Sequence, residues 1–132
     1  MIGAALIARL TADSALAALV GTRIYPLEGP EEATYPLITY LQVSSGDNSS
    51  RGLVGAQKHF RTLQQIDIYA RTALEAQAIA VAVRASLDGQ VNQTWGGVTI
   101  AAALFDDQFD GNFEPDPNLH RIIQQYRIAV SE

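Results

Sequence analysis

The sequence has no cysteine, a single lysine (Lys58) and two histidines among its 132 residues. Without cysteine there is neither a disulfide framework nor a thiolate metal site, so stability has to come from core packing or from partner subunits. The nine basic residues are scattered from Arg9 to Arg127 and are outnumbered by fourteen acidic ones, which gives a net charge of −5. Nucleic-acid binding driven by clustered basic residues is therefore disfavoured.

Long hydrophobic runs and a basic leader are also lacking. The wholly apolar runs are a few residues long, far short of a membrane span, and Met1 leads into an alanine-rich amphipathic segment. We therefore expect a soluble protein that is made in the cytoplasm and does not bind membranes. An apolar fraction of 48% with 17% charged residues is typical of a folded chain, and the length predicts a single domain spanning residues 1–132.

Two segments have helical patterns. Ile2, Leu6 and Leu10 recur every four residues, and Asp13 can cap a short helix that Gly21 then ends. The stronger pattern starts with Thr72-Ala73-Leu74-Glu75, which has the spacing of a capping box. It continues as one apolar stripe suited to covering a sheet, formed by Ala76, Ile79, Ala80, Val83 and Leu87.

Alternating apolar and polar residues predict four strands, over 37–43, 60–70, 98–104 and 122–130. Residues 23–26 are a short extended piece, whereas 44–57 and 105–118 have the composition of long connections. The predicted fold class is α+β, with a mostly antiparallel sheet of about four strands and two main helices packed on one face. The other face would be freer to meet partners.

Catalytic and metal-binding groups are scarce. The two histidines, His59 and His120, flank predicted strands among polar residues, which favours exposed positions. The segment from Asp106 to Glu114 begins like a calcium-binding loop, but its twelfth position is Pro117 where a bidentate glutamate is needed. We therefore expect an acidic, solvated loop over residues 106–116, and no catalytic, cofactor or metal site.

Several segments, taken in order, resemble the phage tail-completion or tail-terminator family across nearly the whole chain. Each motif alone is weakly specific, so the order and spacing carry the resemblance. The segments are Val20-Gly21 after the first helix, Arg23-Ile24-Tyr25-Pro26, Tyr35-Pro36-Leu37-Ile38-Thr39-Tyr40, Gln65-Ile66-Asp67-Ile68-Tyr69-Ala70 with Glu75-Ala76, and the closing strand from Arg121 to Ile128.

The resemblance implies a virion protein without enzymatic activity, assembled in the host cytoplasm and placed at the neck-proximal end of the tail. Members of that family form a ring, commonly of six subunits, on the last ring of the tail tube. The ring stops polymerisation of the tube and meets the head connector. DNA passes through such a ring without specific binding, and an acidic channel would suit that passage. Possible lumen residues are Asp106, Asp107 and Asp110.

Other surface residues are candidates for assembly contacts, chiefly in the polar connection before residue 59. Trp95, in a predicted turn, could either anchor a subunit contact or cap the core. The candidates are Asp47, Asn48, Arg51, Leu53, Val54, Lys58 and Trp95. Two alternatives stay open at this stage: another head–tail connector or neck component, and a small metal-dependent hydrolase that uses Asp106 or Asp110.

Overall fold

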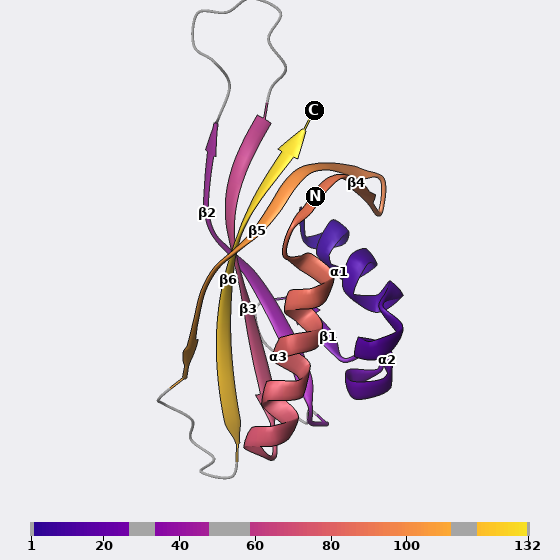
Figure 1. Ribbon diagram of the computed structural model, residues 1–132, viewed down its shortest axis with the longest axis vertical. Coiled ribbons are helices and arrows are strands. Elements are labelled where there is room, and N and C mark those ends of the chain that lie inside the picture. Colours follow the sequence, from indigo (N-terminus) through magenta and orange to yellow (C-terminus); the bar gives the residue numbers. More distant parts are fainter. Residues whose placement is uncertain (1, 27–33, 48–58, 112–118, 132) are drawn as a thin grey trace, which may run out of the picture.

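The computed structural model describes residues 2–26, 34–47, 59–111 and 119–131, and within them one six-stranded sheet is covered by three helices (Figure 1). The strand order across the sheet is β1-β2-β3-β6-β5-β4. Adjacent strands are antiparallel except β1 and β2, which are parallel. The strands are β1 (Ile24–Pro26), β2 (Leu37–Asp47), β3 (His59–Ala70), β4 (Gln90–Trp95), β5 (Val98–Asp110) and β6 (His120–Ser131).

The α+β class and the mostly antiparallel sheet are confirmed, whereas the predicted numbers of about four strands and two main helices are too low. The short β1 lies at one edge and β4 at the other. Four of the six residues of β4 are polar, so it lacks the alternating pattern of a half-buried strand. The turn predicted at Gly96 and Gly97 is confirmed, since both have positive φ angles that favour glycine.

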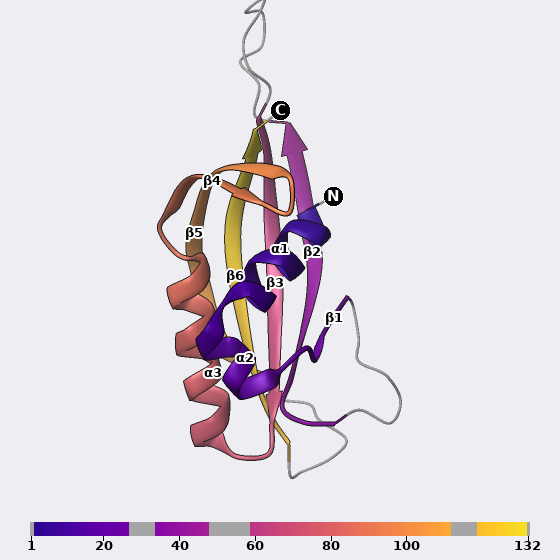
Figure 2. The same ribbon diagram turned by 90° about the vertical axis from the view of Figure 1, so that its right-hand side faces the viewer.

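The helices α1 (Ile2–Ala12), α2 (Ser14–Val20) and α3 (Ala73–Leu87) all lie on one side of the sheet (Figures 1 and 2). Asp13 caps α2 as predicted, because its carboxylate accepts the backbone N–H groups of Ala15 and Leu16. Gly21 ends that helix with a φ of 61°. No single described helix is long and apolar enough to cross a membrane, although α1 and α2 reach that length and composition as a pair bent by 92°.

Helix α3 begins at the predicted cap. The Thr72 hydroxyl accepts the N–H of Glu75 at 3.1 Å, and the Glu75 carboxylate accepts the N–H of Arg71, one residue earlier than in a standard capping box. Its predicted stripe from Ala76 to Leu87 is buried. The stripe meets apolar side chains of the sheet and of α1 and α2, among them Leu6, Leu10, Leu16, Ile38, Ile66, Ile68, Ile122, Tyr126 and Ile128.

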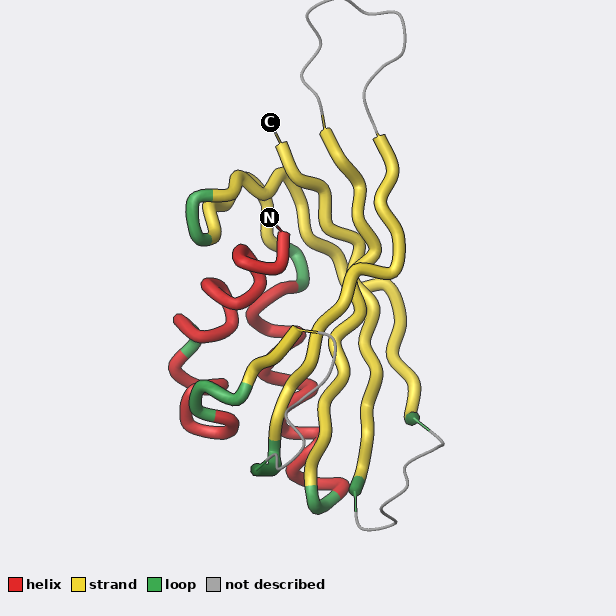
Figure 3. The backbone as a smooth tube through the Cα atoms, turned by 180° about the vertical axis from the view of Figure 1, so that it is seen from behind, coloured by secondary structure: helices red, strands yellow, loops and turns green. Residues whose placement is uncertain are grey.

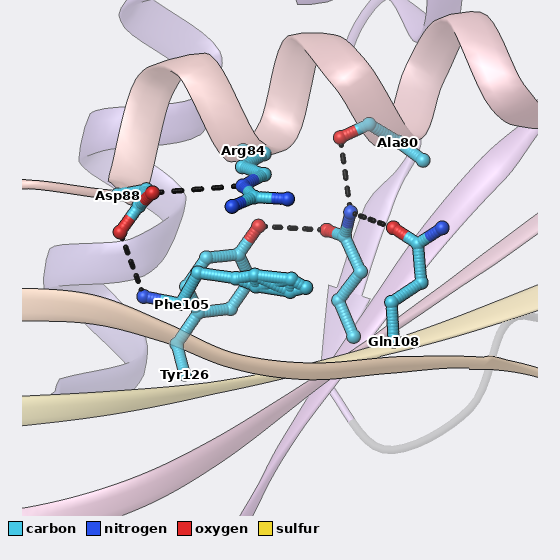
Figure 4. Close-up of polar contacts among 7 residues, drawn as sticks. Ala80, Arg84, Asp88, Phe105, Gln108 and Tyr126 are labelled. Atoms are coloured by element: carbon cyan, nitrogen blue, oxygen red, sulfur yellow. Dashed lines mark hydrogen bonds and ion pairs between the residues drawn. The ribbon is translucent and has the colours of Figure 1, made fainter.

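A buried polar cluster also joins α3 to the sheet (Figure 4). The side-chain amide of Gln124 donates to the Ala80 carbonyl at 3.0 Å and to the side-chain oxygen of Gln108 at 2.9 Å. The Tyr126 hydroxyl donates to the Gln124 oxygen at 2.8 Å, so the buried amide is hydrogen-bonded at both its nitrogen and its oxygen. Burial raises the pKa of the Tyr126 phenol well above its usual value.

Two strands continue into segments for which the sequence predicts loops. Strand β5 runs to Asp110 through register shifts at 100/102 and 105/107, and β2 runs to Asp47 through a shift at 42/44. The loop prediction is therefore wrong for Phe105–Asp110 and for Ser44–Asp47. Irregularities of this kind interrupt the alternation on which a strand prediction depends. The remainder of the two predicted loops, over 48–58 and 112–118, lies outside the described residues.

Candidate assembly surface

One face of the sheet carries no helix among the described residues, and we call it the open face (Figure 3). Side chains alternate along each strand, so the register fixes which residues lie there. On β6, Ile122, Gln124 and Tyr126 face the helices. The open face consequently includes Gln65, Asp67 and Tyr69 of β3, Arg121, Ile123, Gln125 and Arg127 of β6, and Leu104, Asp107 and Phe109 of β5.

An ion pair lies on the open face between β3 and β6. A guanidinium nitrogen of Arg121 lies 2.5 Å from a carboxylate oxygen of Asp67, whose side chain is only 5% exposed. The other carboxylate oxygen accepts the side-chain amide of Gln65 at 2.9 Å. The guanidinium also lies over the Tyr69 ring, 5.5 Å from its centroid. Both Asp67 oxygens thus have donors, and Arg121 is held against the face rather than extended into solvent.

Large apolar side chains remain accessible on the same face. Leu104 is 52% exposed and Phe109 is 43% exposed, and Phe109 pairs across the ladder with Ile123. Together with Tyr69 and the arginines, they form a surface of apolar, aromatic and arginine side chains. This composition is typical of protein–protein contacts, because aromatic and arginine side chains dominate the binding energy of interfaces.

The acidic residues singled out in the sequence do not share one surface. Asp106 forms an ion pair with Arg127 at 3.0 Å, and Asp107, which pairs with Gln125, also lies on the open face. Asp110 pairs with Ile122 and therefore faces the helix side, where it lines a small depression with Gln77 and His120. Because the negative charge of Asp106 is balanced by Arg127, the open face is not a continuous negatively charged surface.

The predicted contact residues have three different outcomes. Asp47 is the last residue of β2, and its backbone pairs with Phe60. Trp95 is buried in the core beneath the guanidinium of Arg9, which lies 5.6 Å from the ring centroid, so core packing is the role that the structure shows for it. The other five lie outside the described residues: Asn48, Arg51, Leu53, Val54 and Lys58.

The geometry offers little to an enzyme. The described residues contain no group of three or more histidine, aspartate or glutamate side chains that could hold a metal ion. His120 is exposed at the start of β6, and Asp110 is on an exposed stretch of β5. The described residues that line the depression beside them include no serine, threonine or cysteine. The exposed side chains of the open face are instead suited to contacts with other proteins.

Comparison with known proteins gives this surface its context. A family model described as tail completion protein gp17 matches residues 4–131. The chain belongs to this tail completion family. No curated protein matches it significantly. Among solved structures, a chain from the virion of a native gene transfer agent (GTA) particle matches with a TM-score of 0.76 and 24% identity, covering 99% of this chain and 97% of that one. At this identity, the match shows that the fold is shared.

Membership of the tail completion family confirms three expectations from the sequence. The resemblance to phage tail-completion proteins is confirmed, and so is a place in the virion, because a tail completion protein is a structural component of the particle. For the same reason the protein is not an enzyme, which removes the metal-dependent hydrolase based on Asp106 or Asp110.

The sequence interpretation missed a second apolar surface in this tail completion protein. On the side of α3 away from the core, Leu74 is 80% exposed and Val81 is 70% exposed, and the exposed Ala78 and Ala85 complete the row. We call these four residues the outer stripe. A signal for it was present, since the 15-residue helix has only two charged residues, Glu75 and Arg84. A helix that is apolar all round is usually covered on all sides.

Proposed function

We propose that this tail completion protein is the subunit of a closed ring, most simply of six copies, at the neck-proximal end of the tail. In that position the ring covers the last ring of the tail tube, stops tube polymerisation and joins the tail to the head connector. The observation that carries the proposal is the open face, a sheet surface with exposed Leu104 and Phe109 in a chain whose family completes tails.

The ring is supported by where the accessible apolar residues lie. Leu104 and Phe109 are on one side of the sheet and the outer stripe of α3 is on the other, so one copy cannot bring the two surfaces together. Contacts between unlike surfaces of identical chains give rings when the rotation closes. The match to a chain of the gene transfer agent virion agrees with a role in a particle.

Further contacts belong to the same proposal. We assign contacts with the tail-tube protein or the head connector to Asp47, at the end of β2, and to Asn48, Arg51, Leu53, Val54 and Lys58, which follow it in the sequence. Asp110 is assigned to the channel side of the ring, where net negative charge lets DNA pass without binding. Asp106 and Asp107 lie on the opposite face of the sheet, among the contact residues of the open face. Trp95 acts from the core, by holding the turn after β4 in place.

The experiment is assembly of the phage or phage-like particle with and without this protein. Without it we expect tailless heads together with tail tubes that exceed their normal length, and added protein should bind to the ends of purified tubes. Overlong tubes distinguish a terminator from another neck component, whose loss leaves tube length unchanged. Normal tails joined to heads in the absence of the protein would overturn the proposal.

A further inference from the structure

Helix α3 has two apolar sides, and one of them packs in the core of the described chain. Its inner side packs on the sheet through Ile79, Val83 and Leu87. The outer stripe, Leu74, Ala78, Val81 and Ala85, follows the 4-3-4 spacing of residues on one helix face and lies opposite the inner side. Large and small residues alternate along the stripe, with Ala78 after Leu74 and Ala85 after Val81, so another surface can approach the helix closely at the alanines.

Extension of the sheet from edge to edge is poorly supported at β5. Beyond Ala103 no described strand pairs with its outer edge. However, the Phe105 N–H donates to the Asp88 carboxylate at 2.8 Å, and the Gln108 N–H donates to the Asp107 carboxylate at 2.8 Å. These backbone N–H groups close to the edge are therefore already hydrogen-bonded to carboxylates. The register shift at 105/107 also makes the edge irregular. At β5, packing between faces is therefore favoured over pairing of strand edges.

We propose that the outer stripe of α3 in one copy packs on the open face of the next copy, around Leu104 and Phe109. This proposal rests on the ring proposed above and names the two surfaces that build it. In the assembled ring α3 is then a helix between two sheets, its own and that of its neighbour. That position explains why a surface helix with only two charged residues retains Leu74 and Val81 at 80% and 70% exposure in the single chain.

Charged side chains lie beside both of the proposed contact surfaces. The charged side chain beside the outer stripe on the β5 side is that of Arg84, which is 55% exposed. The carboxylates Asp106 and Asp107 border Leu104 on the open face. Arg84 is paired with Asp88 at 3.5 Å, and Asp106 is paired with Arg127, so Asp107 is the carboxylate that a neighbour's Arg84 can meet. This contact fixes the orientation of the two surfaces more than it adds affinity.

Two variants separate the surfaces. Val81→Glu places a carboxylate in the outer stripe and improves helix propensity at an exposed site, so the fold should be retained. Leu104→Glu places one on the open face beside its cross-strand partner Arg127, where opposite charges are compatible with pairing. Ala78→Glu on α3 and Ala17→Glu on α2 form a matched pair, because both alanines are exposed helix residues and only Ala78 is in the stripe.

The decisive measurement is native mass of each variant alone and of a mixture, with circular dichroism as the check on folding. At concentrations where the unmodified protein forms rings, we expect Val81→Glu, Leu104→Glu and Ala78→Glu each to be monomeric and Ala17→Glu to form rings. Mixing Val81→Glu with Leu104→Glu should give a dimer of one copy of each, twice 14.2 kDa, and nothing larger. Each variant still has one intact surface, and the two intact surfaces are complementary.

Other outcomes overturn the inference in distinguishable ways. If folded Val81→Glu and Leu104→Glu both form rings, these surfaces do not build the ring, while the proposed function stands. A dimer formed by either variant alone indicates a symmetric contact between like surfaces and contradicts the inference. If the outer stripe instead receives a different virion component, Val81→Glu will form rings but fail to bind tail tubes. An unmodified protein that is monomeric and does not bind tubes contradicts the proposed function itself.

Discussion

The side-chain amide of Gln124 on β6 donates to the backbone carbonyl of Ala80 on α3 at 3.0 Å, and Gln124 is fully buried. This bond crosses the layer between helix and sheet and fixes how α3 lies on β6. The same amide also donates to Gln108, and its oxygen accepts the Tyr126 hydroxyl. The position of the outer stripe therefore depends on a residue that is not itself at the surface.

Replacing Gln124 by leucine should lower the free energy of unfolding by about 1–3 kcal/mol, because the buried Tyr126 hydroxyl loses its acceptor. Adding Tyr126→Phe should recover much of that loss, since the hydroxyl that had lost its acceptor is then removed. Denaturant unfolding of the two single variants and the double variant measures this coupling. Additive losses would show that the bond between these side chains contributes little.

Stability should also depend on pH in the alkaline range. Burial raises the pKa of Tyr126 in the folded protein, whereas in the unfolded chain it is close to 10. The folded state holds the phenol proton more tightly, so this contribution is complete below pH 10 and is lost as the pH rises further. The free energy of unfolding should fall by up to about 1.4 kcal/mol per pH unit from this group. In Tyr126→Phe this part of the slope should disappear, and an unchanged slope would rule out Tyr126 as its origin.

The ion pair on the open face gives a third prediction. Arg121→Leu leaves the buried Asp67 carboxylate without its cationic partner, and we expect a loss on the order of 3 kcal/mol, moderated by the partial exposure of Arg121. The control is Arg61→Leu, an exposed arginine on the same face, which should change stability by less than about 0.5 kcal/mol. Thermal unfolding of both variants is the measurement. Equal effects would mean that burial of Asp67 is not what makes Arg121 important.

The start of α3 gives a fourth prediction. Thr72→Ala removes the hydroxyl that accepts the Glu75 N–H and should cost about 1 kcal/mol. Thr72→Asp should restore that stability, because aspartate caps the same N–H and also suits the positive end of the helix dipole. Chemical denaturation of the two variants tests this. A Thr72→Ala protein as stable as the unmodified one would show that the cap does not matter here.

The parts of the fold that were predictable depend on local signals. Thr72 with Glu75 marks the start of α3, Asp13 and Gly21 bound α2, and alternation marks β3 and β6. Strand β4 and the second half of β5 were not predictable in the same way. Asp106, Asp107 and Asp110 have the composition of a loop. Asp107 and Asp110 are held in a strand by pairing with Gln125 and Ile122 of β6, a contact that the local sequence does not show.

The assembly surface could be predicted only in outline. The register shift at 100/102 puts Leu104 on the face opposite Ile100, which alternation alone does not predict. Nor does alternation show which face of the sheet the helices cover. That choice is made in the folded chain by Gln124 and the buried stripe of α3. The outer stripe was overlooked for a related reason. An apolar stripe such as Ala76 to Leu87 fully accounts for a helix on a sheet, and the exposed Leu74 and Val81 become informative only once that stripe is known to be buried.

Native mass spectrometry of the purified protein, alone and with purified tail tubes, tests the central claim most directly. The account predicts a closed ring with a mass that is a fixed multiple of 14.2 kDa, most simply six, and binding of that ring to the ends of tubes. A protein that stays at 14.2 kDa at every concentration and does not bind tubes would contradict it.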